Sequence, residues 1–142
     1  MHISIINGPN LHNIGEREPH IYGNVNFLDY LNDLKTEFST IDIDYFQFSD
    51  EGKIVELIHR KAKFVSGIIL NAGAYTHTSV AIRDAIAAIE IPVVMVHISN
   101  VYAREYYRYN NIIAPECKGI ITGFGLDSYK LALLSFLGAC HK

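Results

Sequence analysis

The sequence predicts one α/β domain in which a five-stranded parallel sheet lies between two layers of helices, forming a three-layer sandwich. Three observations support this fold class. Apolar runs typical of strands alternate with amphipathic stretches typical of helices along the whole chain. Two of those runs are almost continuously apolar, as expected of strands that are buried on both faces. The 142 residues, 49% of them hydrophobic, are enough for one domain with its own core and too few for two.

Five stretches have the composition of strands: residues 2–6, 41–48, 64–70, 92–99 and 118–122. The first is short and β-branched, and it ends in the turn-forming cluster Asn7-Gly8-Pro9-Asn10. The second alternates polar and apolar residues, which is typical of a strand with one less buried face. The third and fourth are the continuous apolar runs, and the fifth is a shorter candidate. Five strands at this chain length favour the flavodoxin-like strand order over a complete dinucleotide-binding fold.

Four stretches with apolar residues at three- and four-residue steps are predicted to form helices: residues 27–38, 54–62, 80–89 and 127–137. Thr78 or Ser79 suits the N-cap of the third helix, and Asp127 or Ser128 suits that of the fourth. Short polar side chains are preferred there because they accept hydrogen bonds from the free N–H groups of the first turn.

One connection is much longer than the others. Residues 7–24, directly after the first strand, are rich in glycine, proline, asparagine and charge, and long connections in compact domains are usually functional. Polar clusters at residues 7–10, 71–78 and 97–100 each follow a predicted strand. Ligands of open α/β sheets bind outside the carboxyl ends of the strands, so we expect these three clusters to converge on one site.

Charge and composition exclude several classes of protein. Twelve Lys and Arg residues against fifteen Asp and Glu give a net charge of −3, which argues against binding to nucleic acid or to an anionic membrane. No apolar run approaches the ~20 residues of a membrane span, and the N-terminus lacks a basic region followed by an apolar stretch. The two cysteines, Cys117 and Cys140, lie far apart, as expected in a reducing compartment. We therefore expect a cytoplasmic protein.

Cofactor and metal motifs are absent from the sequence. Residues 7–15 contain two glycines but lack the Gly-Lys-Ser/Thr ending of a phosphate-binding loop, and residues 123–125 lack the third glycine of a dinucleotide-binding turn. His77 and His97 have no cysteine or histidine at metal-ligand spacing. We therefore expect neither a metal nor an organic cofactor.

The remaining polar residues suit proton transfer and anion binding. A tyrosine titrates near ~10, and a nearby guanidinium favours its phenolate, so Tyr22 beside Arg17 is a candidate base; both are otherwise solvated loop residues. His97 ends an apolar strand, where it is either a proton donor or a hydrogen-bonded core residue. The N–H groups and the Ser99 hydroxyl that follow His97 suit a carboxylate.

Two further groups of residues have two interpretations each. Arg104 and Arg108 lie four residues apart, so we expect them on one helical face, where they supply a second cation or form a solvated basic surface. A helix cap explains one residue of the polar turn 71–79 but leaves its other polar residues unexplained. Asp84, on the helix after this turn, is an interface residue or a local structural carboxylate.

Six strings of the sequence carry all of these residues except Arg108: Ile6-Asn-Gly-Pro-Asn-Leu11, Gly15-Glu-Arg-Glu-Pro19 with Tyr22-Gly23, Asn71-Ala-Gly-Ala-Tyr-Thr-His-Thr-Ser79, Ala81-Ile-Arg-Asp-Ala85, Val96-His-Ile-Ser-Asn-Val101 and Ala103-Arg-Glu105. In order and spacing, over nearly the entire chain, they resemble type II 3-dehydroquinate dehydratase. The resemblance implies a flavodoxin-like fold spanning residues 1–142, with a mobile active-site loop around residues 12–24. It also implies trimers gathered into a dodecamer, in which Asp84 reaches the site of a neighbouring subunit.

The activity that the resemblance implies is the anti elimination of water from 3-dehydroquinate, through an enolate, to give 3-dehydroshikimate. This step belongs to the shikimate pathway of aromatic amino-acid biosynthesis, quinate breakdown uses it as well, and the family needs no metal or cofactor for it. Tyr22 would remove a proton from C2, with Arg17 and Arg104 as the stabilising cations. Asn10 would orient a water on the enolate oxygen, and His97 would protonate the leaving C1 hydroxyl. The substrate-binding residues would be Asn71, Gly73, His77, Asp84, Ile98, Ser99 and Arg108.

This sequence departs from the family pattern near the predicted acid. Met95 stands where the family usually has a glutamate, two residues before His97, and we expect this change to affect rate and pH optimum rather than reaction type. The alternatives are a non-catalytic, flavodoxin-like binder of an anionic small molecule or flavin, and an assembly protein. Retention of Tyr22, Arg17 and His97 together favours the enzyme, because a binder needs no base and acid.

Overall fold

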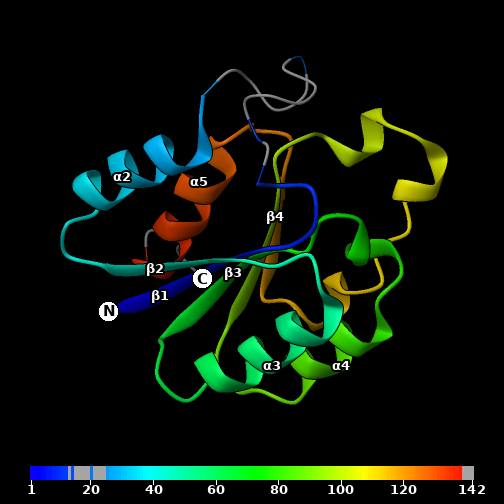
Figure 1. The fold of residues 1–142 in the computed structure, drawn as a ribbon, viewed down its shortest axis with the longest axis horizontal. Helices are drawn as coiled ribbons and strands as arrows, with labels where there is room; N and C mark the ends of the chain where they lie inside the picture. Colours follow the sequence, from blue (N-terminus) through cyan, green and yellow to red (C-terminus); the bar gives the residue numbers. More distant parts are fainter. Residues whose placement is uncertain (13, 15–19, 21–24, 139–142) are drawn as a thin grey trace.

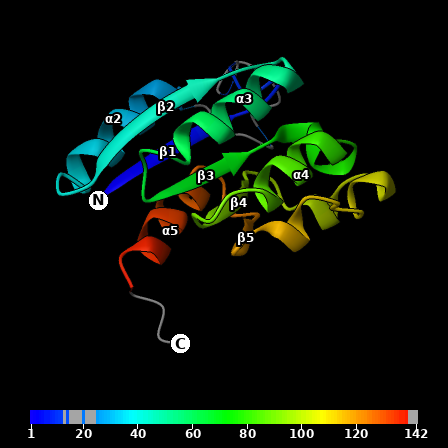
Figure 2. The same cartoon turned by 90° about the horizontal axis from the view of Figure 1, so that it is seen from below.

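The computed structural model describes residues 1–12, 14, 20 and 25–138. Its strands are β1 (His2–Asn7), β2 (Asp42–Gln47), β3 (Gly67–Asn71), β4 (Val93–His97) and β5 (Gly119–Thr122). In this part of the chain they form one parallel five-stranded sheet in the order β2-β1-β3-β4-β5. Figure 2 shows the strands side by side, with β2 at one edge and β5 at the other. This is the strand order of flavodoxin, so the predicted fold class is confirmed.

The helices are α2 (Phe27–Glu37), α3 (Glu51–Lys61), α4 (Val80–Ala87) and α5 (Asp127–Phe136). Figure 1 shows α2 and α5 on one side of the sheet and α3 and α4 on the other, which gives the three predicted layers. Short 3-10 turns follow two of the strands: Gly73–His77 after β3, then Val101–Ala103, Tyr106–Arg108 and Ala114–Glu116 after β4. No helix in the described residues is long and apolar enough to cross a membrane.

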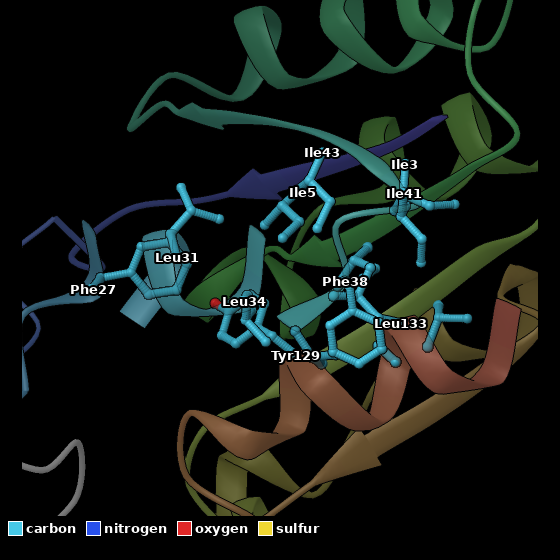
Figure 3. Packing of buried hydrophobic residues seen from close by; sticks show 14 of the residues in the cluster. Ile3, Ile5, Phe27, Leu31, Leu34, Phe38, Ile41, Ile43, Tyr129 and Leu133 are labelled. Carbon is cyan, nitrogen blue, oxygen red and sulfur yellow. The ribbon is translucent and has the colours of Figure 1, made fainter. Parts of the chain in front are cut away.

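Side-chain alternation along the strands divides the core into two layers. Ile3 and Ile5 of β1 pack against α2 and α5, whereas Ile6 points to the opposite face and packs with residues of α3 and α4. Figure 3 shows the first layer, with Tyr129 and Leu133 of α5 among the side chains of α2 and the sheet. Because both faces are covered, the central strands are apolar almost throughout, as the sequence predicted.

The third strand begins later than predicted. Residues 64–70 were expected to form it, but β3 starts at Gly67, and Phe64 lies 73% exposed after α3. The N–H groups of Phe64 and Val65 donate to the carbonyl of Lys61 at 2.9 and 3.1 Å. They cap the end of α3 and so cannot pair with a neighbouring strand.

One of the two predicted helix caps is confirmed and the other is wrong. Ser79 caps α4, and its hydroxyl accepts a hydrogen bond from the Ile82 N–H at 2.9 Å. In α5 the cap position is Leu126, which makes no side-chain cap bond, and Asp127 is already helical. Ser128 is fully buried and donates to the His97 carbonyl at 3.0 Å instead. Its hydroxyl therefore joins α5 to the end of β4.

Candidate active site

A cavity of about 240 Å³ lies at the carboxyl edge of the sheet, between the loops that follow β1, β3 and β4. These loops carry the three polar clusters, so their predicted convergence is confirmed. Of the predicted site residues that the structure describes, all but Asp84 line the cavity: Asn10, Asn71, Gly73, His77, His97, Ile98, Ser99, Arg104 and Arg108.

The loops after β1 and β3 pack against each other backbone to backbone. The Gly8 N–H donates to the Asn71 carbonyl at 2.7 Å, and a Cβ added to Gly8 would lie 2.7 Å from the Ala72 carbonyl oxygen. Gly73 has a φ of +58°, and a Cβ there would lie 3.0 Å from the Pro9 carbonyl oxygen. Glycine is therefore required at both positions, and the loop that carries Asn10 is held against the loop that carries His77.

His97, at the end of β4, is buried with 6% of its surface exposed. Its Nε2 atom has no hydrogen-bond partner among the described residues. The pKa of His97 is lowered to about 4, first by burial and then, in decreasing order, by the charges of His77, Arg108 and Arg104. The imidazole is therefore neutral at pH 7, and His97 is one of the residues that line the cavity.

The His77 ring lies over the His97 ring, with centroids 6.3 Å apart and planes 11° apart. Its Nδ1 lies 2.7 Å from the Asn110 carbonyl oxygen, which only accepts hydrogen bonds. Nδ1 therefore carries the hydrogen, and Nε2 of a neutral His77 is an acceptor.

The backbone after His97 directs its carbonyl groups to one side. The His97 and Ile98 carbonyls accept hydrogen bonds from the Gly123 and Gly125 N–H groups, at 3.2 and 3.0 Å. In a trans peptide the C=O and N–H groups point in opposite directions, so the N–H groups of Ile98 and Ser99 point away from that segment. Both residues line the cavity, where such N–H groups suit a carboxylate.

Arg104 and Arg108 both line the cavity, but the prediction that they share a helical face is wrong. Arg104 follows the 3-10 turn Val101–Ala103, and Arg108 ends the separate turn Tyr106–Arg108. The two turns meet at Glu105, which has an extended backbone conformation and breaks the helical path.

Glu105 is a cavity residue that the sequence analysis missed, although its spacing of three from Arg108 is typical of an ion pair. Its carboxylate lies 3.6 Å from Arg104 Nε and 2.6 Å from Arg108 Nε. A hydrogen bond to its own backbone and then the Arg108 guanidinium lower the pKa of Glu105 to about 2. The described lining thus has two guanidinium groups against one carboxylate, which favours an anionic ligand.

Asp84 lies outside the cavity of its own chain. It is on α4 with its side chain 65% exposed, 3.3 Å from the Arg83 guanidinium. Arg17, Tyr22 and most of the predicted loop 12–24 lie outside the described residues. On either side of that loop, Leu11 and Phe27 are buried in the layer of α2 and α5.

The described residues hold no group of three or more His, Cys, Asp or Glu side chains placed to bind a metal ion. Cys117 is partly buried, and its burial raises the pKa of the thiol to about 12. The thiol is therefore protonated at pH 7 and is a poor nucleophile.

Comparisons with known proteins identify the family and the fold of the chain. The family model described as dehydroquinase class II matches residues 1–137. The 3-dehydroquinate dehydratase of a Nitratiruptor species is 50% identical, over 95% of this chain and 88% of that protein. The crystal structure of type II dehydroquinase from Butyrivibrio crossotus has a TM-score of 0.91 at 40% identity, covering 96% of this chain and 97% of that one. The type II dehydroquinase from Propionibacterium acnes has a TM-score of 0.90 at 35% identity, with 98% and 97% covered.

Proposed function

Since this chain belongs to the class II dehydroquinase family, we propose that it is a hydro-lyase that removes water from 3-dehydroquinate and forms 3-dehydroshikimate. The substrate is a small carboxylate with a ring ketone and several hydroxyl groups. A polar cavity with an excess of guanidinium groups supports this choice of substrate, because it offers partners for each of those groups.

The first step is the removal of the C2 proton, next to the ketone. We assign it to Tyr22, with the Arg17 guanidinium favouring the phenolate form. Asn10 would orient a water on the oxygen that becomes negative in the enolate. Its position on the cavity wall, with a φ of +66°, supports this role because strained backbone conformations cluster at functional sites.

His97 supplies the second proton. His97 is neutral at pH 7, and a neutral imidazole is a poor proton donor. The carboxylate of the bound substrate would offset the nearby positive charges that contribute to the low pKa of His97. His97 would then take up a proton on binding and give it to the departing C1 hydroxyl, which leaves as water. Tyr22 gains one proton and His97 loses one, so a single proton transfer through solvent restores the enzyme.

The remaining cavity residues would hold the substrate. The N–H groups of Ile98 and Ser99 suit the carboxylate, and the acceptor nitrogen of His77 suits a hydroxyl. Asn71, Gly73 and Arg108 also line the cavity and would help to hold the hydroxyl groups and the carboxylate of the substrate. The non-catalytic binder is not favoured, because the relatives and the family are enzymes.

We further propose that the enzyme acts in the cytoplasm as a dodecamer built from trimers. The exposed carboxylate of Asp84, outside its own cavity, supports a role in the site of a neighbouring subunit. The activity itself is tested by adding 3-dehydroquinate to the purified protein and following the absorbance of the conjugated enone product. Enone formation supports the proposal, and its absence with a correctly folded protein contradicts it.

A further inference from the structure

A buried tyrosine joins the two loops beneath the cavity. Tyr129 of α5 is fully buried, and its hydroxyl donates a hydrogen bond to Asn7 Oδ1 at 2.8 Å. The same hydroxyl accepts a hydrogen bond from Asn71 Nδ2 at 2.9 Å. Neither the mechanism nor the sequence motifs account for this residue.

Asn7 and Asn71 are partners in the register of β1 and β3, and each is the last residue of its strand. Partners on neighbouring strands point to the same face of a sheet, here the face that α2 and α5 cover. From these two residues the chain enters the loops of Asn10 and Gly73. Tyr129 therefore holds both loops at their origin.

The hydrogen bonds fix the orientation of the Asn71 amide. A tyrosine hydroxyl has one hydrogen, and Tyr129 gives it to Asn7, so Asn71 must present its NH₂ group to Tyr129. The Asn71 Oδ1 atom then faces the other way, where it accepts the Gly73 N–H at 3.3 Å. The second N–H of the amide has no partner in the described structure, and Asn71 lines the cavity.

We propose that Tyr129 is a positioning residue of the enzyme: its hydroxyl sets the amide orientation in which Asn71 offers this second N–H to the substrate. The inference rests on the proposed function. Without the hydroxyl, only the long hydrogen bond from the Gly73 N–H, at 3.3 Å, still distinguishes the oxygen of the Asn71 amide from its nitrogen. It then also adopts the flipped orientation, which presents an oxygen where a donor is needed.

Tyr129→Phe tests this role because it removes one oxygen atom and keeps the ring, which packs against Phe27 with centroids 5.1 Å apart. An Asn71 contact that binds substrate and transition state equally affects KM and not kcat. We expect KM for 3-dehydroquinate to rise about tenfold, as for the loss of one buried hydrogen bond, with kcat within about twofold of wild type. Tyr30→Phe is the matched control, since Tyr30 packs against the same apolar layer and is no part of the cavity wall. Its KM should equal that of the wild type.

A double-mutant cycle separates positioning from general destabilisation. If Tyr129 acts through Asn71, Tyr129→Phe raises KM in the wild-type background but not in Asn71→Ala. Thermal unfolding of every variant shows that the assayed protein is folded. If Tyr129→Phe does not fold, Asn7→Ala replaces it: the freed hydroxyl hydrogen can then point to Asn71, and the same KM rise is expected.

Each outcome has one meaning. An unchanged KM in folded Tyr129→Phe, or an equal rise in both backgrounds, overturns the inference while an active wild type leaves the proposed function intact. An inactive wild type contradicts the proposed function and the inference together. A KM rise confined to the background that contains Asn71 supports the positioning role.

Discussion

His77 and His97 stack with their ring centroids 6.3 Å apart and their planes 11° apart. The positive charge that His77 can carry is one cause of the low pKa of His97, after the burial of His97 itself. A positive charge this close to His97 opposes its protonation, and the negative charge of an anionic ligand would act in the opposite direction.

The first prediction concerns stability in acid. The pKa of His97 falls from 6.5 to about 4 on folding, so the unfolded chain binds more protons between these pH values. The His97 contribution is complete above pH 6.5 and is lost as pH falls toward 4. We expect the wild type to lose ~2–3 kcal/mol of unfolding free energy between pH 7 and pH 4.5 because His97 is protonated in the unfolded chain and not in the folded one.

Urea unfolding of the wild type and His97→Gln at both pH values measures this contribution. The pKa of Asp44 is also lowered, by its hydrogen bonds to Lys61 and Ser4 against the opposing effect of burial. That loss in acid is common to both proteins and cancels in the comparison. Equal losses of stability in the two proteins would show that His97 is not protonated on unfolding.

The second prediction is proton uptake on ligand binding. Quinate keeps the carboxylate and hydroxyl groups of the substrate but lacks the ketone, so it cannot be dehydrated. At pH 6 we expect the binding of quinate to be accompanied by the uptake of up to about one proton per site, because the quinate carboxylate raises the pKa of His97. Calorimetry in two buffers of different ionisation enthalpy measures the uptake. His97→Gln should bind with none, and an uptake that persists in this variant would assign the proton to another group.

The sequence predicted the strand order and the location of the cavity because both follow from apolar runs and the polar residues that end them. It did not predict where β3 begins, since Phe64 has the same apolar character in a helix-capping turn as in a strand. The spacing of Arg104 and Arg108 fits one helix as well as two separate turns. Tyr129 was missed because its partners, Asn7 and Asn71, are brought to it only by the folded sheet.

The third prediction concerns assembly. If Asp84 serves a neighbouring site, Asp84→Ala should raise KM about tenfold without changing the oligomeric state. Asp33→Ala is the control, because it removes an exposed carboxylate from α2 on the other side of the sheet. Sedimentation and activity, measured together on one dilution series, complete the test. A monomer with full specific activity would contradict the proposal that Asp84 contributes to the site of a neighbouring subunit.

The most direct test of the whole account is the rate of enone formation from 3-dehydroquinate by the wild type and by His97→Gln. His97 is the proposed general acid, and general acid catalysis contributes about 10²–10⁴-fold to a rate. We predict rapid enone formation by the wild type and a rate at least ~100-fold lower in the folded variant. A wild type that forms no enone, or a variant that forms it at the wild-type rate, would contradict the account.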